Sequence, residues 1–158
     1  MRDVARFHFG FVVPYETHDD AADVIHAVAA SRGDLGLVPV AAAGSWWRAL
    51  EAPGAPKVIA RLPFVERADH PAALASYVVS KPVDEDAEVS DVRLFSLMLA
   101  DASARPPGDA SVIARAGAAV LLGVEAPLTA AALSAALPPG ATLHPVGSHA
   151  APFIHTSS

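Results

Sequence analysis

The feature that most limits how this chain can fold is a helix-like segment that leads directly into a short apolar strand. Residues 28–40 read Val-Ala-Ala-Ser-Arg-Gly-Asp-Leu-Gly-Leu-Val-Pro-Val. Upstream, the spacing of one buried helical face is found at Ala21, Val24, Ile25, Val28 and Ala29. Gly33 is expected to end this helix, and Pro39 to stop the strand that follows it. Such a direct helix-to-strand passage predicts an α/β arrangement.

The first half of the chain is expected to be a small βαβ lobe. Strands are predicted at residues 7–13, 35–40, 57–64 and 75–81. The first of them reads Phe-His-Phe-Gly-Phe-Val-Val and is rich in aromatic and β-branched residues. Helices are predicted at about 18–32, capped by Thr17, and at 44–51. Because ligands of open α/β sheets lie beyond the carboxyl ends of the strands, this lobe predicts a small-molecule crevice.

The second half is expected to be a separate α+β domain. An acidic connector at residues 82–90 places the boundary between domains 1–83 and 84–158. Beyond the connector, strands are predicted at 92–99, 116–125 and 142–146, one or two helical turns at 111–115, and a helix at 127–137. This order is typical of a ferredoxin-like sandwich. The predicted fold class is therefore α/β followed by α+β.

Composition excludes several classes of protein. Hydrophobic residues make up 53% of the chain and charged residues 18%, enough for a packed core. The net charge is −6 and the eleven basic residues are scattered, which argues against nucleic acid as a partner. No apolar run reaches the ~20 residues that a membrane span needs, and no signal-peptide core follows the N-terminus. No cysteine is present. A cytoplasmic protein without a membrane partner is expected.

Arg61 is the first candidate site residue, because it lies in an otherwise apolar strand. A buried arginine requires a partner, since an unpaired charge in a protein interior is very costly. Two interpretations follow. Arg61 has a structural place, in an ion pair with Glu66 or on an edge strand, or it is a cation that faces a crevice and receives a ligand carboxylate.

A second group of candidates is Ser45, Trp46 and Trp47, at the start of the predicted helix 44–51. Backbone N–H groups at a helix start can receive an anion. Adjacent residues do not share one helical face, so one tryptophan is expected in the core and the other at a ligand or dimer contact.

Ser148 and His149 follow the last predicted strand, where a loop can present side chains to a ligand. Their alternative is an exposed terminal loop. His149 is expected to share one crevice with Arg61, so that carboxylate binding weakens as pH rises through the histidine pKa. The seven histidines show no H-x-x-x-H spacing, so neither a metal nor a cofactor is expected. No catalytic set is identified.

Three segments resemble known families. Residues 33–39, Gly-Asp-Leu-Gly-Leu-Val-Pro, resemble the G-x-A-D-Y-G-V-V-P-I segment of prephenate dehydratases, and residues 57–64 resemble the strand that follows it. The second half is similar to an ACT-type amino-acid-sensing domain. Together with residues 6–11 and 147–150, these segments resemble the C-terminal region of bacterial chorismate mutase-related proteins.

The chain departs from the dehydratases at their catalytic positions. Ala41, Ala42 and Ala43 stand where the family has Glu-Asn-Ser. At the Thr-Arg-Phe motif only Ser76 keeps a hydroxyl, and no arginine remains for a dianionic substrate. Dehydratase activity is therefore not expected. No predicted helix is long enough for a helical chorismate mutase.

The resemblance thus implies a non-catalytic, ligand-sensing or regulatory module of aromatic amino-acid metabolism, with a small aromatic amino acid or carboxylate as ligand. One alternative is an enzyme of the chorismate mutase or prephenate dehydratase type that acts with a segment or partner outside this chain. A further alternative is a dimerisation module. A homodimer is expected, through exposed strand edges or the tryptophan pair.

Overall fold

The structure is a computed structural model that describes residues 1–10, 12–67, 74–82 and 91–155. The predicted domain boundary falls within 83–90 and so lies outside the described residues. In chain order, the elements are α1 (Arg2–Phe9), α2 (Ala21–Ala30), β1 (Gly36–Pro39), the 3-10 helix η1 (Trp46–Leu50), β2 (Lys57–Leu62), β3 (Val65–Arg67), β4 (Ser76–Ser80), β5 (Val92–Met98), β6 (Ser111–Ala116), β7 (Ala119–Glu125), α3 (Ala130–Ala135), β8 (Thr142–His149) and β9 (Phe153–His155).

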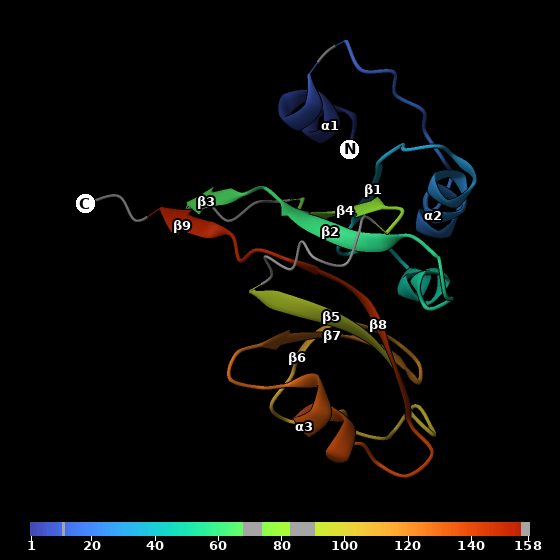
Figure 1. Cartoon of the computed structure of the whole chain (residues 1–158), viewed down its shortest axis with the longest axis vertical. Helices are drawn as coiled ribbons and strands as arrows, with labels where there is room; N and C mark the ends of the chain where they lie inside the picture. Colours follow the sequence, from blue (N-terminus) through green and yellow to red (C-terminus); the bar gives the residue numbers. More distant parts are fainter. Residues whose placement is uncertain (11, 68–73, 83–90, 156–158) are drawn as a thin grey trace.

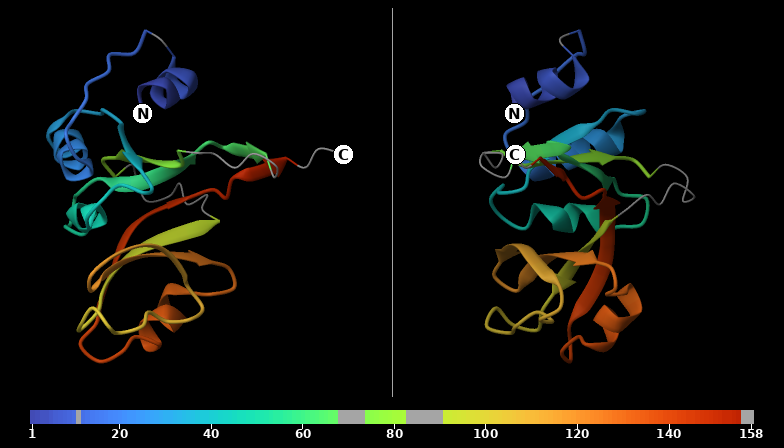
Figure 2. Two further views of the ribbon diagram at one scale, coloured as in Figure 1. Left: turned by 180° about the vertical axis from the view of Figure 1, so that it is seen from behind. Right: turned by 90° about the vertical axis from the view of Figure 1, so that its left-hand side faces the viewer.

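One seven-stranded sheet, in the order β1-β4-β2-β8-β5-β7-β6, runs through both halves of the chain. The sheet is curled, with α1 and α2 near one end and α3 at the other (Figures 1 and 2). All neighbouring strands are antiparallel except β2 and β8, which are parallel. β3 and β9 form a separate two-stranded parallel sheet. The predicted mixture of helices and sheet is confirmed. The βαβ arrangement predicted for the first half is wrong for the described residues, because β1, β4 and β2 pair antiparallel. No helix in the described ranges is long and apolar enough to cross a membrane.

The two halves of the sheet meet where β2 pairs with β8, at Val58 and Gly147. Gly147 has a φ of 138°, in the region that favours glycine. A Cβ atom there would overlap the peptide backbone of Val58 and lie 2.8 Å from its carbonyl carbon. The parallel junction therefore depends on a residue without a side chain.

Two apolar cores form because β5 and β7 are buried on both faces. On the inner, concave face, Val92 and Leu94 of β5 pack with buried side chains from α2, η1, β1, β2, β4, β7 and β8. On the outer face, Phe95 and Leu97 of β5 pack with residues of β7 and with Leu133 of α3. We call these the inner core and the outer core. Burial on both faces explains why residues 119–124 are an uninterrupted apolar run.

The prediction of a strand at residues 7–13 is wrong, because residues 7–9 form the last turn of helix α1. The less exposed positions of α1 and its N-cap are Met1, Val4, Ala5, Arg6 and His8. Four of them, Met1, Val4, Ala5 and His8, follow helical spacing. Phe7 and Phe9, whose β propensity suggested a strand, are exposed. The helical stripe begins before residue 7 and outweighs that propensity. α1 ends at Gly10, with a φ of 91°.

The helical turns predicted at 111–115 are also wrong, because this segment is strand β6. It pairs with β7 through a two-residue turn, Gly117–Ala118, in which Gly117 has a φ of 60°. The apolar run 116–125 therefore contains a hairpin turn as well as a strand.

Helix boundaries differ from the predictions where a different side chain forms the cap. The N-cap of α2 is Asp20 instead of Thr17, and its carboxylate accepts a 2.8 Å hydrogen bond from the Asp23 N–H. The C-cap is Ser31, so the helix ends before Gly33. In the second half, Thr129 caps α3, which begins three residues after Pro127.

Gly147→Ala is expected to lower the free energy of unfolding by about 3 kcal/mol or more, because backbone strain and overpacking each cost about 1–3 kcal/mol. Gly33→Ala is the matched control, since Gly33 has nearly the same φ, 136°, but nothing within 4 Å of its Cβ position. The control is expected to lose only the strain contribution. Urea unfolding of both variants measures the difference, and equal losses would show that the contact with Val58 is unimportant.

Candidate functional site

A row of residues across three strands forms one wall of the candidate site. Val92 of β5 pairs with Glu125 of β7 on one side and with His149 of β8 on the other. Paired residues of neighbouring strands point to the same face of a sheet. The three side chains therefore lie together on the inner face, at the end of the inner core.

Arg61 reaches the same face because of a β-bulge. The register between β2 and β4 shifts between Val58 and Ala60, which leaves Ile59 as an extra residue. Without this insertion, Arg61 would point to the face opposite Val58. With it, Arg61 pairs with Tyr77 of β4 on the inner face.

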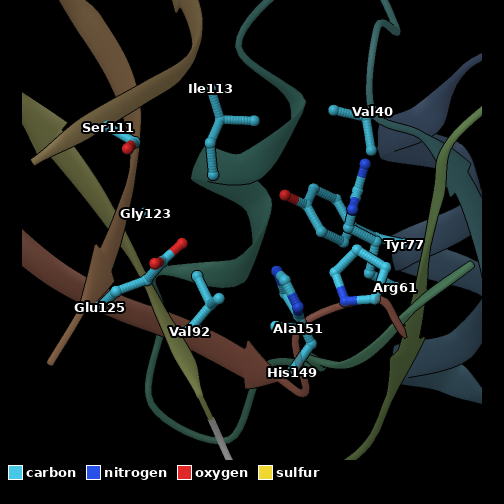
Figure 3. Close-up of a pocket in the computed structure, with 11 residues that line it drawn as sticks. Val40, Arg61, Tyr77, Val92, Ser111, Ile113, Gly123, Glu125, His149 and Ala151 are labelled. Carbon is cyan, nitrogen blue, oxygen red and sulfur yellow. The ribbon is translucent and has the colours of Figure 1, made fainter. Parts of the chain in front are cut away.

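These residues line a cavity of about 230 Å³. Figure 3 shows Arg61, Tyr77 and Val40 on one side, Ser111, Gly123 and Glu125 on the other, and His149 between them. The full lining is Val40, Arg61, Tyr77, Val92, Ser111, Ile113, Gly123, Glu125, His149, Ala151 and Pro152. The cavity is mainly apolar with a few convergent polar groups, a composition typical of sites for small molecules.

Arg61 also forms the ion pair that the sequence suggested. Its Nη2 lies 3.1 Å from Oε1 of Glu66, and the two side chains are 24% and 16% exposed. The ion-pair interpretation is therefore confirmed, and the same guanidinium lines the cavity. Its planar fork has five N–H donors, so one bond to Glu66 leaves capacity for a second anion.

Tyr77 provides a neutral hydrogen-bond donor to the cavity. Burial raises the pKa of its phenol to about 12, and the positive charge of Arg61 acts in the opposite direction. The phenol is therefore protonated at neutral pH. In Figure 3 its hydroxyl points into the space between the two walls.

His149 is buried beside Tyr77, with the two ring centroids 5.5 Å apart. Its Nδ1 lies 2.8 Å from the carbonyl oxygen of Ala150. A carbonyl oxygen can only accept, so Nδ1 carries the proton and Nε2 of the neutral ring has a free lone pair. Burial lowers the pKa of His149, and the positive charge of Arg61 lowers it further. The hydrogen bond to Ala150 acts in the opposite direction and raises the pKa. The imidazole is therefore neutral at pH 7.

The predicted proximity of Arg61 and His149 is confirmed, since both line this cavity. Ser148 does not join them. It pairs with Arg93, one position away from the His149 row, so it faces the other side of β8. Ser45 lies at the N-cap of η1, makes no capping bond with its side chain, and is not among the lining residues.

The expectation that one tryptophan lies outside the core, at a ligand or dimer contact, is wrong, because Trp46 is 4% exposed and Trp47 is fully buried. η1 lies within the inner core and packs against α2, so two of its sides are covered. At its end, Glu51 accepts a 2.7 Å hydrogen bond from Ser96 of β5. Neither tryptophan lines the cavity. Their indole N–H groups are buried without a hydrogen-bond partner.

Sequence reasoning missed the opposite wall of the cavity, formed by Ser111, Ile113, Gly123 and Glu125. Glu125 ends an apolar strand and Gly123 interrupts it, and these were the only signals in the sequence. Within the described ranges, no group of three or more His, Asp or Glu side chains is placed to hold a metal ion.

Comparison of the chain with protein-family models, with curated proteins and with solved structures gives no match.

The buried, neutral His149 is expected to make stability depend on pH. Its pKa in the folded state lies below the unfolded value of 6.5, so the unfolded chain binds more protons below that pH. Stability should therefore be complete above about pH 6.5 and decline as pH falls through the folded pKa. In His149→Gln this decline should be smaller, measured by urea unfolding between about pH 5.5 and 7.5. His144→Gln, at an exposed position of the same strand, should leave the profile unchanged. Identical profiles in all three proteins would contradict the assignment.

Proposed function

We propose that this chain is a cytoplasmic, non-catalytic ligand-binding module that takes a small carboxylate in the cavity between Arg61 and Gly123. The observation that carries the proposal is the convergence of a permanent cation, a protonated phenol and an imidazole, from three different strands, on a mainly apolar cavity. Arg61 and Tyr77 can both donate to a carboxylate, and the apolar walls can cover the rest of the ligand.

The position of Ser76 supports binding over dehydratase chemistry. This residue stands where the dehydratases have their catalytic threonine. Its side chain is fully buried and donates to the carbonyl oxygen of Leu74 at 3.2 Å. It is not among the residues that line the cavity. A hydroxyl engaged in this way is not presented to a cavity ligand.

The resemblance of residues 33–39 to prephenate dehydratases suggests the ligand class: aromatic amino acids, chorismate or prephenate. On this proposal, β1, β2 and β4 with α2 correspond to the dehydratase-like lobe. The antiparallel strands β5 to β8 with α3 correspond to a reduced ferredoxin-like sandwich of the ACT type. The module would then sense a product or intermediate of aromatic amino-acid synthesis.

A thermal-shift screen with phenylalanine, tyrosine, tryptophan, chorismate and prephenate tests the proposal. At least one of these should raise the melting temperature, since a ligand at a hundredfold excess over its Kd adds about 2.7 kcal/mol. Arg61→Met should weaken its binding by about 2 kcal/mol, roughly thirtyfold, because a charge-assisted hydrogen bond is lost.

Glu66→Gln is the matched control for this variant. It breaks the same ion pair but leaves the Arg61 cation in place, so binding should be kept or strengthened. If both variants lose stability and binding equally, Arg61 is only a structural partner of Glu66. If none of the five compounds shifts the melting temperature of the wild type, the ligand class is wrong.

A second function, dimerisation, is favoured by the sheet of β3 and β9. Its two strands pair only with each other among the described residues, and a two-stranded sheet alone is marginally stable. The large side chains around it are more than half exposed: Phe64, Val65, Phe153 and Ile154. The tryptophan pair is buried and so is not available for this contact.

The chain is expected to form a homodimer through these strands, with twice the mass of one chain in light scattering at micromolar concentration. Phe153→Ser combined with Ile154→Ser should shift the mass toward the monomer, because the two substitutions remove exposed apolar side chains from β9. Leu35→Ser removes an exposed leucine elsewhere and should leave the mass unchanged. A wild-type monomer would contradict the expectation.

A further inference from the structure

Gly123 lies in the middle of β7, in an otherwise apolar and buried strand. A glycine inside a strand weakens it, because the chain loses more freedom on folding and no side chain is available to pack. Residues on both sides of it, Leu122 and Val124, are buried in the outer core. The stability of the strand therefore does not explain why a glycine stands at position 123.

The backbone conformation does not explain the glycine either. Gly123 is not among the glycines with positive φ, so an L-residue fits its conformation. A Cβ atom there would lie 3.0 Å from Cδ1 of Ile113 and 3.5 Å from Cγ1 of Val92, both side-chain atoms. This differs from Gly147, where the obstacle is backbone. It also differs from Gly36, where three packed valine methyl groups lie within 2.9 Å.

Both neighbours of that Cβ position line the cavity, and so does Gly123 itself. Ile113 borders open space and can shift by the few tenths of an ångström that a methyl group requires. In Figure 3, Gly123 and Ile113 lie on the wall opposite Arg61 and Tyr77. A side chain at position 123 would therefore occupy cavity volume and leave the fold intact.

We propose that Gly123 is the specificity-determining residue of the cavity, and that it leaves room for the apolar end of a carboxylate held by Arg61 and Tyr77. Ile113, the extra residue of the bulge in β6, sets the size limit beside it. A glycine inside a strand often marks a bulge or a place where a ligand or another backbone approaches closely, and the cavity beside Gly123 provides the space for a ligand. The inference rests on the proposed carboxylate-binding function.

The test uses wild type and Gly123→Ala with a series of probes of increasing length: benzoate, phenylacetate, 3-phenylpropionate and 4-phenylbutyrate. Binding is measured by titration calorimetry. In Gly123→Ala, the longest probe that the wild type accepts should bind at least tenfold more weakly. The affinity for the shortest probe that binds should change less than twofold. Ile113→Ala should shift the preference toward the longer probes. Gly108→Ala, whose Cβ would have nothing within 4 Å, should leave the series unchanged.

Unfolding without ligand provides the second readout. Gly123→Ala should be at least as stable as the wild type in urea, because the strand gains a side chain. A clear loss of stability would show that the glycine serves packing, and would overturn the inference. An unchanged length preference in Gly123→Ala would overturn it too, while the proposed carboxylate function stands. If the wild type binds none of the probes, both are overturned.

Discussion

The contact between the backbone of Val58 and Gly147 holds the two halves of this protein together. Among the described strands of the large sheet, the only parallel pairing is made here, and it joins β2 from the first half to β8 from the second. The inner core depends on it as well, because that core takes side chains from both halves. The candidate site, in turn, has walls from both halves: Arg61 and Tyr77 on one, Gly123 and Glu125 on the other. Any change that separates the two strands would therefore open the cavity.

Strand positions were largely predictable from this sequence, and their pairing was not. Alternating or continuous apolar runs located β1, β2, β4, β5, β7 and β8 to within a few residues. The sequence contains no local signal that β8 pairs with β2, because that contact joins segments far apart in the chain. Exposed aromatic residues were misleading in α1, where helical spacing decides the structure. In β6, two β-branched residues and a glycine turn outweighed a helical interpretation.

The site was only half predictable, and the reason is the β-bulges around it. One bulge lies in each of three described strands. The residues at which the register shifts are Ile59 in β2, Ile113 in β6 and Val146 in β8. A bulge interrupts the period of two, so the face on which a later residue lies cannot be read from alternation alone. Arg61 and His149 stood out by their chemistry. Ile113 and Gly123 are ordinary residues whose importance comes only from their position.

The two buried tryptophans give the chain an internal optical reporter of its cavity. The rings of Trp46 and Trp47 are 5.8 Å apart, and Trp46 lies 6.2 Å from Tyr77, whose other neighbour is His149 at 5.5 Å. These four rings form a continuous series of contacts from η1 to the cavity wall. Indole emission is sensitive to the polarity and motion of adjacent groups, and the chain contains no other tryptophan. Occupancy of the cavity can therefore be followed by the intrinsic fluorescence of the unlabelled protein.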